Sequence, residues 1–393
     1  MPLKSINSID LIMLSNFDRS VGGRETWAYG FIPVFLGENP HLNLHIYGLT
    51  PNDVPHKGEE LISNLSEDAK FRLKMTFFEV IWPKVPWFFS MLFQFRNHCK
   101  KSGCITPDMV LCVGGLSELM CMLFSRKYKT VKKILWMRTI FLNEKAEKIP
   151  SFLLPIGRWF EAKLLNKLDI LLANGTDIVE HYARYGLNVH TVKNGVDLAK
   201  WNVGDLTVAG PTRIAFIGRL APAKGIEEFL LAVEKIKART NFADLEFIIA
   251  GQGPYSSRVK QMHEKGWLTY LGSVDNQQLP SHMANVDICV ALTRAARFGG
   301  GGGTSNALLE QMAAGRVIVA WDNIIFRQIL DEGTAYLCAQ DNVDVLVECL
   351  MTITNDREGA KSKALKCKEI MKGFSNEAQV RKFETVIEGG IIE

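Results

Sequence analysis

Two cationic residues, Arg219 and Lys224, lie within the segment IAFIGRLAPAKGIEEFL at residues 214–230. The apolar run before Arg219 predicts a β-strand and the apolar spacing after Gly225 predicts a helix, so both cations belong to one strand-to-helix loop. Such a loop can hold fixed positive charge where a diphosphate leaving group gains negative charge as its bond to a sugar breaks. A surface loop with two solvated basic residues explains this segment equally well, and the segment alone leaves both interpretations open.

A glycine run and the helix after it form a second group of candidate binding residues. The segment VDICVALTRAARFGGGGGTSNALLEQMAAG covers residues 286–315, and its candidates are Gly301, Gly302, Gly303, Thr304, Ser305 and Asn306. Glycine lets backbone N–H groups come close to a ligand, and the N-terminus of the following helix adds partial positive charge. Glu310 lies farther along that helix, where a carboxylate can accept two hydrogen bonds from a ribose diol. A glycine-rich surface loop without a ligand is the alternative.

Short apolar and β-branched runs alternate with helix-length segments along the chain, in two series. The first series is Ile9–Leu14, Asn43–Tyr47, Met109–Val113, Ile134–Met137, Ile170–Ala173 and Val189–Val192. The second is Arg213–Ile217, Leu245–Ala250, Leu268–Leu271, Ile288–Ala291, Val317–Ala320 and Thr334–Cys338. Continuous apolar runs of this kind indicate parallel strands covered on both faces. Each series therefore predicts one doubly wound, Rossmann-like α/β domain.

The segment VGDLTVAGPT at residues 203–212 separates the two series and is rich in glycine and small residues, as linkers are. We expect an N-terminal domain at 1–205, a C-terminal domain at 206–373, and a closing helix in 374–393 that crosses back toward the first domain. The predicted apolar face of that helix is Val380, Phe383, Val386 and Ile387. Open α/β sheets bind ligands at the carboxyl ends of their strands, so the sequence predicts a site in a cleft between the domains.

Taken together, these segments resemble glycosyltransferase family 4, a family of retaining enzymes with the GT-B fold, in which two Rossmann-like domains face each other across a cleft. The resemblance covers nearly all of the second domain and scattered points of the first. The stretches that carry it are GGRE at 22–25, KNGVDLAKW at 193–201, GRLAPAKG at 218–225, GQGP at 251–254, LGSVDNQQLPSHMANVDICV at 271–290, SNALLEQMAAGRVIVA at 305–320 and FSNEAQVRKFE at 374–384.

The resemblance implies a role for several residues. Arg219 and Lys224 contact the donor diphosphate, and the backbone around Gly272 and Val274 holds the nucleotide base. Glu310 binds the ribose. The loop with Gly22 and Gly23 lies beside the donor phosphates and the acceptor, on the acceptor side of the molecule. The donor is a nucleoside diphosphate sugar of UDP or GDP type, the acceptor is a glycan or a lipid-linked acceptor, and the pathway is surface polysaccharide or glycoconjugate synthesis. The resemblance adds no further cofactor.

The chain departs from the family pattern at two positions. The family has a Glu eight residues before the residue matched by Glu310, and this sequence has Gly302 there. Many members also have a His after an N-domain strand near the transferred sugar, whereas the strand ILWM is followed here by Arg138. Arg138 either holds donor or acceptor or pairs with a carboxylate of the fold. The loop before Gly302 carries two extra cations, Arg294 and Arg297, which either read an unusual donor or lie on the surface.

Composition excludes several other classes of function. The 393 residues carry a formal net charge of +4, which gives no concentrated basic face for nucleic acid. No Asp-x-Asp motif or carboxylate cluster implies a bound metal, so metal-independent hexosyl transfer is expected. The eight cysteines form no CxxC pair, which favours reduced thiols in the cytoplasm.

No apolar stretch approaches the length of a membrane span, so we expect a cytoplasmic protein, with peripheral contact at the inner membrane face as one interpretation. Residues 71–101 combine aromatic and basic side chains, which suits either a membrane interface or a pair of core-packing helices; the helix pair is favoured. Two rival functions remain: a sugar-nucleotide epimerase on the same fold, and a non-catalytic protein that binds nucleotide sugar and supports another transferase.

Overall fold

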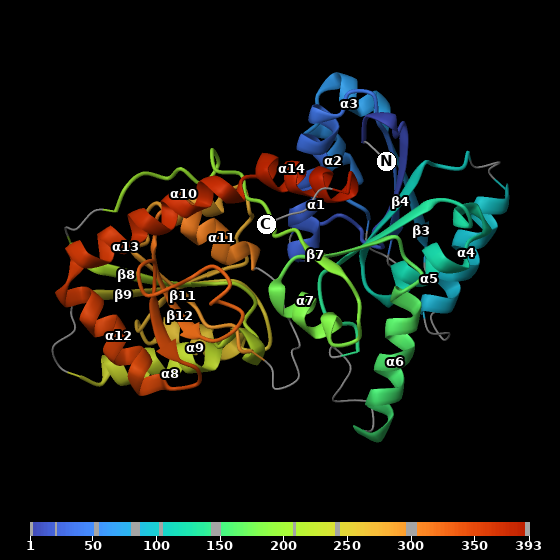
Figure 1. Ribbon diagram of the computed structural model, residues 1–393. Helices are drawn as coiled ribbons and strands as arrows, with labels where there is room; N and C mark the ends of the chain where they lie inside the picture. The colour runs from blue at the N-terminus through green and yellow to red at the C-terminus, as the bar shows by residue number, and fades with distance from the viewer. Residues whose placement is uncertain are drawn as a thin grey trace. The chain divides into compact units, whose positions relative to one another are not determined.

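The computed structural model describes residues 3–19, 22–50, 55–79, 87–101, 105–142, 151–206, 210–239, 244–295 and 305–389. The chain forms two compact units (Figure 1). Unit 1 is built mainly from Met1–Gly195 and Asn376–Glu393, and unit 2 from Val196–Ala295 and Thr304–Ser375. The chain thus enters unit 2 at Val196, ahead of the boundary expected at residue 205. It returns to unit 1 at Asn376.

Unit 1 contains a seven-stranded parallel sheet in the order β3-β2-β1-β4-β5-β6-β7. Its strands are β1 (Ser8–Ile12), β2 (Asn43–Thr50), β3 (Leu73–Glu79), β4 (Met109–Gly114), β5 (Lys132–Met137), β6 (Ile170–Ala173) and β7 (Val189–Thr191). Its α-helices are α1 (Gly23–Glu38), α2 (Gly58–Ser63), α3 (Glu67–Arg72), α4 (Trp87–Lys101), α5 (Leu116–Phe124), α6 (Leu154–Leu165), α7 (Thr176–Ala183) and α14 (Asn376–Ile387). The predicted first series of strands is confirmed.

Strand β3 was not predicted. Its residues belong to the aromatic and basic segment 71–101, for which the sequence favoured two helices, and that expectation is wrong for the first half. The run LKMTFFE is rich in the aromatic and β-branched residues that suit a strand. It pairs with β2 along its whole length, from Leu73 beside Leu44 to Glu79 beside Thr50.

Helix α14 closes one face of the unit 1 sheet. The predicted apolar face of Val380, Phe383, Val386 and Ile387 is buried. The Phe383 ring stacks on Trp136 of β5 at 5.4 Å between ring centroids and meets Phe31 of α1 edge to face at 5.3 Å. Such aromatic pairs bury large apolar area in a defined geometry. This contact holds the last helix of the chain against the first.

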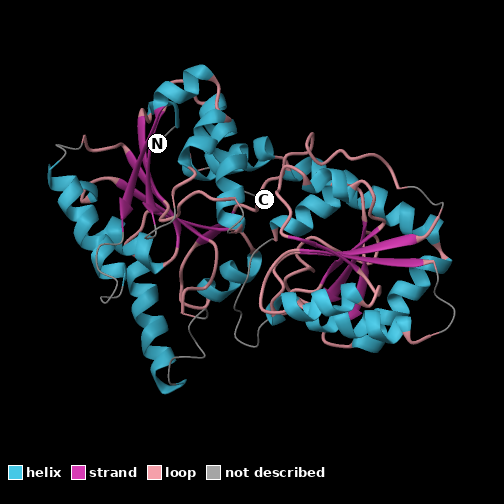
Figure 2. Ribbon diagram, turned by 180° about the vertical axis from the view of Figure 1, so that it is seen from behind, coloured by secondary structure: helices cyan, strands magenta, loops and turns pink. Residues whose placement is uncertain are grey.

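Unit 2 contains a six-stranded parallel sheet in the order β10-β9-β8-β11-β12-β13, with helices on both faces (Figure 2). Its strands are β8 (Thr212–Ile217), β9 (Leu245–Ala250), β10 (Thr269–Gly272), β11 (Ile288–Ala291), β12 (Val317–Asp322) and β13 (Tyr336–Ala339). Its α-helices are α8 (Ile226–Lys237), α9 (Ser256–Glu264), α10 (Leu279–Met283), α11 (Asn306–Ala313), α12 (Val343–Asn355) and α13 (Arg357–Ile370). All the strands predicted for the second series are confirmed. In the described residues of both units, no helix has the length and apolarity to cross a bilayer.

A buried charge pair lies inside unit 1. Lys127 Nζ is 2.6 Å from Asp10 Oδ2, and both side chains are almost fully buried. Tyr128 donates its hydroxyl to the same Asp10 oxygen at 2.7 Å. Burial raises the pKa of Asp10, while Lys127 acts against that shift. The negative charge of Asp10 is therefore stabilised in the core by the positive charge of Lys127.

Replacing Lys127 with Met should destabilise unit 1, because it leaves the Asp10 carboxylate buried without a cation. Breaking a buried pair from one side costs about 3–5 kcal/mol. Urea unfolding followed by circular dichroism measures the change, with Lys129→Met at an exposed position as the matched control. The double variant Asp10→Asn/Lys127→Met should recover part of the loss. Equal stability of Lys127→Met and the control would contradict the prediction.

Candidate functional site

The order of strands in unit 2 reverses between β8 and β11, which are neighbours in the sheet. Loops that follow such a pair of strands begin at the same edge, and open α/β sheets bind ligands there. The loop after β8 contains Arg219 and a 3-10 turn, η5, at Pro222–Lys224. The loop after β11 contains Thr293, and Lys224 Nζ donates to Thr293 Oγ1 at 3.4 Å. Both predicted diphosphate ligands therefore lie at the switch point of the sheet.

The two cations at this edge are not neutralised by the described part of the chain. Arg219 is exposed and Lys224 is half-buried, and neither forms an ion pair with a described carboxylate. Burial, and then the neighbouring Arg219, lower the pKa of Lys224. The edge thus concentrates positive charge in a partly desolvated position. That is the electrostatic environment that an anionic ligand such as a diphosphate requires.

Close backbone approaches explain the glycines of the GRLAPAKG and GQGP stretches. Gly225 has a left-handed φ of 73°, and a β-carbon there would lie 2.4 Å from the carbonyl oxygen of Leu292 in the loop after β11. Gly251 has a φ of 143°, and a β-carbon there would lie 1.8 Å from the carbonyl oxygen of Gly218. Only glycine fits at such contacts. The glycines let three loops meet at the edge that presents Arg219 and Lys224.

The predicted ribose ligand and base-binding loop lie together in unit 2. Glu310 is a buried residue of α11, and its Oε1 accepts a hydrogen bond from Asn276 Nδ2 at 3.2 Å. Asn276 follows Gly272, which has a left-handed φ of 69°, and Val274, which packs partly against the core. The structure thus places the residues predicted for ribose and base within one region of unit 2.

The helix N-terminus after the glycine run is described only in part. Helix α11 begins at Asn306, and Ser305 occupies its N-cap position without a side-chain capping hydrogen bond. Gly301, Gly302, Gly303 and Thr304 lie outside the described residues.

Arg294, one of the two extra cations of the loop after β11, is held by carboxylates of unit 2. It forms ion pairs with Glu228 and with Asp341, the latter at 2.7 Å. Burial opposes its charge, but Glu228 and Asp341 outweigh burial and raise the pKa of Arg294. These contacts therefore give no support to the interpretation that Arg294 binds an unusual donor. Arg297 lies outside the described residues.

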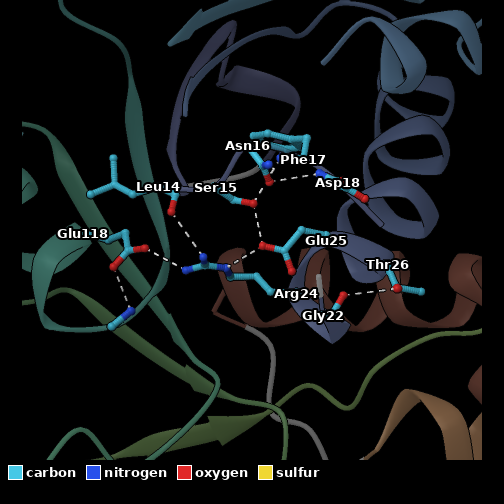
Figure 3. Close-up of polar contacts among 11 residues, drawn as sticks. Leu14, Ser15, Asn16, Phe17, Asp18, Gly22, Arg24, Glu25, Thr26 and Glu118 are labelled. Carbon is cyan, nitrogen blue, oxygen red and sulfur yellow. Dashed lines mark hydrogen bonds and ion pairs between the residues drawn. The ribbon is translucent and has the colours of Figure 1, made fainter. Parts of the chain in front are cut away.

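The corresponding edge of the unit 1 sheet carries a compact polar cluster (Figure 3). Strand order reverses there between β1 and β4. Arg24, in the first turn of α1, reaches Glu118 Oε1 of α5 at 2.8 Å and Glu25 Oε1 at 3.5 Å. Ser15, after β1, donates its hydroxyl to Glu25 at 2.5 Å. Burial opposes the charge of Arg24, but Glu118 and Glu25 outweigh it and raise the pKa of Arg24.

The glycines of the GGRE stretch lie where this cluster meets a helix N-terminus. Gly22 occupies the N-cap position of α1 in an extended conformation, and Gly23 is the first residue of the helix. Gly22 accepts a hydrogen bond from the backbone N–H of Thr26 at 3.2 Å. Arg24 and Glu25 of the same stretch form the cluster described above, so the two glycines sit next to its buried charges.

Arg138 follows β5, and its guanidinium lies against two tryptophan rings that also contact each other. Its guanidinium carbon is 4.4 Å from the ring centroid of Trp27 and 4.8 Å from that of Trp136. Nη1 donates to Asn194 Oδ1, while Nε and Nη2 are buried without a hydrogen-bond partner in the described chain. Burial, and then Arg24, lower the pKa of Arg138 to about 9, and Glu25 acts in the opposite direction. No described carboxylate forms an ion pair with Arg138, in contrast to Arg24.

Sequence reasoning assigned no role to Arg24, Glu25 or Glu118. The first two stand in the quoted GGRE stretch, but their partner Glu118 is far away in the sequence. A local sequence pattern could have indicated Glu118 as a candidate. A glycine pair ends the buried run MVLCVGG, and an acidic residue follows in the first turn of the next helix. Glu118 there accepts a hydrogen bond from the Gly115 N–H at 3.0 Å. The ion pair to Arg24 cannot be read from that local pattern.

Comparisons with known proteins agree with this geometry. Residues 211–356 match the family described as Glycosyl transferases group 1. The phosphatidyl-myo-inositol mannosyltransferase of Mycolicibacterium smegmatis is 31% identical over 210 residues, which are 51% of this chain and 51% of that protein. The protein of the same name from Mycobacterium tuberculosis is 30% identical over 154 residues, 38% of this chain and 39% of that protein. The chain spans about half the length of the curated relatives it matches.

Solved structures extend the likeness over the whole chain. Sucrose-phosphate synthase from Thermosynechococcus elongatus superposes with a TM-score of 0.73 at 14% identity and covers 98% of both chains. The HepE protein of Anabaena, in complex with UDP and glucose, superposes with a TM-score of 0.69 at 13% identity, covering 97% of this chain and 99% of that one. The chain has the GT-B fold. Together with the family match in unit 2, this confirms the resemblance to glycosyltransferase family 4.

Gly225 provides a test of how the loops at the switch-point edge of unit 2 are packed. Gly225→Ala should destabilise the protein more than Gly266→Ala. Both glycines have a left-handed φ, 73° and 70°, but only Gly225 has a neighbour within 4 Å of the added carbon. The left-handed conformation costs about 1–2 kcal/mol at either position. Overpacking against Leu292 should add about 1–3 kcal/mol at Gly225 alone. Denaturant midpoints of the two variants measure the difference, and equal midpoints would refute the tight contact with Leu292.

Proposed function

We propose that the chain is a retaining glycosyltransferase that moves a sugar, of hexosyl type, from a UDP- or GDP-linked donor to a glycan or lipid-linked acceptor in surface polysaccharide or glycoconjugate synthesis. The observation that carries the proposal is the pair Arg219 and Lys224. These cations lie without a described carboxylate partner at the switch-point edge of a unit that matches group 1 glycosyltransferases. Positive charge fixed at such an edge stabilises a departing diphosphate.

In this proposal, Lys224 and Arg219 act on the donor diphosphate as negative charge grows on the leaving oxygen. Glu310 binds the ribose diol, and the backbone at Gly272 and Val274 holds the base. The acceptor attacks from the face that the diphosphate leaves, and the leaving phosphate takes the acceptor proton, so no protein nucleophile is needed. The half-buried position of Lys224 supports its assignment, because a desolvated cation interacts more strongly with developing charge than a solvated one.

On the unit 1 edge, we assign the backbone at Gly22 and Gly23 to the acceptor or to donor phosphate oxygens. Arg138 is assigned to the same ligands through its two buried nitrogens without a partner in the described chain, Nε and Nη2. The name of the mannosyltransferase relatives points to a phosphatidyl-myo-inositol acceptor, which supports a lipid-linked acceptor here. The HepE structure contains UDP and glucose, which supports a nucleotide-sugar donor. A cytoplasmic protein with peripheral contact at the inner membrane face suits such an acceptor.

A panel of nucleoside diphosphates and their sugars tests the proposal. A ligand that binds only the folded state raises the melting temperature by mass action, so thermal shifts identify the base and the sugar. Turnover of the best donor, measured as release of nucleoside diphosphate, then separates an enzyme from a binding protein that supports another transferase. Donor binding without release or transfer in the presence of candidate acceptors would favour the non-catalytic alternative.

Lys224→Ala should lower kcat far more than it raises the donor Kd, because the contact strengthens as the diphosphate departs. Loss of one such contact costs about 2.7–4 kcal/mol in the barrier, or about 10²–10³ in kcat. Lys260→Ala, at an exposed position of α9, is the matched control and should leave kcat unchanged. Steady-state kinetics and donor titration measure both quantities. Near-normal kcat for Lys224→Ala would remove this residue from the mechanism.

Activity should survive treatment with EDTA, since Arg219 and Lys224 supply the charge that a divalent cation supplies in other transferases. The measurement is the initial rate before and after chelation, with Mg²⁺ or Mn²⁺ added back. Complete loss of the rate with EDTA and recovery with either ion would contradict metal-independent transfer.

A further inference from the structure

One helix of unit 1 turns a broad apolar face away from the protein. In Figures 1 and 2, α6 extends away from the sheet of unit 1. Large apolar side chains stand exposed along α6 and the short 3-10 turn before it, η4 (Ser151–Leu153). They are Phe152 at 74% exposure, Leu153 at 41%, Ile156 at 63%, Trp159 at 55% and Phe160 at 57%. A contiguous exposed apolar patch on a folded domain marks an interaction surface.

The orientation of α6 is fixed by its other face. Glu161, Leu164 and Leu165 are buried, and Tyr182 of α7 donates its hydroxyl to Glu161 Oε1 at 2.6 Å. These residues belong to the second half of the helix, so α6 is anchored by that half. Ile156, Trp159 and Phe160 are spaced as one helical face, and that face is not the buried one. The apolar stripe is therefore additional to the stripe that packs on the core.

The exposed face also carries positive charge at one end. Lys163 follows Trp159 by one turn of the helix, and its Nζ lies 4.0 Å from the centroid of the Trp159 ring. Lys167, two residues past the end of α6, is exposed as well. The acidic residue of this segment, Glu161, is buried on the opposite face. Residues 152–167 thus present aromatic and aliphatic side chains bordered by lysines, with no acidic side chain exposed.

We propose that this face, formed by Phe152, Leu153, Ile156, Trp159 and Phe160 with Lys163 and Lys167, binds the surface of an anionic lipid bilayer. Aromatic and aliphatic side chains partition below the headgroups, while lysines extend their charged ends to anionic lipids. The inference deepens the peripheral membrane contact of the proposed function and assigns it to α6 rather than to residues 71–101. The inference rests on the membrane contact in the proposed function and does not depend on sugar transfer.

Charge favours lipid over a second copy of the chain. In a symmetric dimer through this face, the same patch meets itself. That arrangement brings the lysines of one copy toward those of the other with no exposed carboxylate from residues 152–167 to offset them. An anionic bilayer supplies the opposite charge over the whole face.

Vesicle co-sedimentation of the full chain tests the proposal without any sugar substrate. Large unilamellar vesicles of equal parts phosphatidylcholine and phosphatidylglycerol are compared with vesicles of phosphatidylcholine alone. The triple variant Ile156→Ser/Trp159→Ser/Phe160→Ser should lose at least about tenfold in partition coefficient on the anionic vesicles. The matched control, Ile324→Ser/Leu365→Ser, removes side chains of similar exposure, 50% and 49%, from unit 2 and should bind as the wild type does.

A charge variant tests the same face without changing its apolar side chains. Lys163→Glu/Lys167→Glu should weaken binding to the anionic vesicles strongly and leave the weak binding to neutral vesicles unchanged, whereas Lys366→Glu/Lys372→Glu in unit 2 should have a smaller effect. This variant also keeps the proposal testable if the triple serine variant does not fold, as judged by circular dichroism.

Three outcomes would overturn the proposal: a wild-type chain that does not sediment with anionic vesicles, α6 variants that bind as tightly as their controls, or a wild-type dimer in gel filtration that becomes monomeric only in the triple variant. The last outcome would assign the face to a second copy. Normal turnover on a water-soluble acceptor in a variant that no longer binds vesicles would separate this surface from the catalytic edge. A wild-type chain that binds the anionic vesicles but shows no turnover with any donor would instead count against the proposed function alone.

Discussion

Parallel pairing of strands around a reversal point is the constraint on which the rest of this structure depends. Because all strands of a sheet run in one direction, their following loops emerge at one edge, and the reversal between β8 and β11 brings two of those loops together without a helix between them. The glycines at 225 and 251 then let the loops touch backbone to backbone. This framework sets the backbone positions of Arg219 and Lys224, and the hydrogen bond from Lys224 to Thr293 adds a side-chain contact for the lysine.

The two units use the same edge differently. In unit 1, Arg24 lies in the first turn of α1 and forms ion pairs with Glu118 and Glu25. The pair with Glu118 joins α1 to α5. In unit 2 the cations of the corresponding loop have no such partners among the described residues. Arg138 is intermediate: it has one amide partner, Asn194, and two aromatic faces, and it keeps a lowered pKa in a desolvated site. An uncompensated buried cation is costly to a fold, which is why it suggests a ligand.

The exposed face of α6 adds a different kind of constraint. Burial of Glu161 against Tyr182 removes the negative charge of the helix from its surface, and what remains outside is apolar and cationic. A helix that only covered a sheet would show the reverse distribution, with polar residues toward water. The same segment thus serves the core through one face and leaves a second face for a partner.

Much of this protein is determined by the sequence alone. The apolar runs predicted six strands in each unit, and the spacing of apolar residues predicted the buried face of α14. The glycines of GRLAPAKG and GQGP marked the loops that meet in unit 2. These features are local: strand burial on both faces, helical periodicity and the left-handed conformation each leave a mark within a few residues. Strand β3 was not predicted, because its run LKMTFFE belongs to residues 71–101, for which the sequence favoured a pair of helices.

Other features were decided only by the tertiary structure. The ion pairs of Arg24 with Glu118 and of Arg294 with Glu228 join residues that are distant in sequence, and a lone arginine looks the same whether it is paired or free. The outward direction of the α6 face is likewise a tertiary fact. Periodicity defines an apolar stripe, but whether that stripe meets the core or the solvent depends on which face the neighbouring elements have already covered.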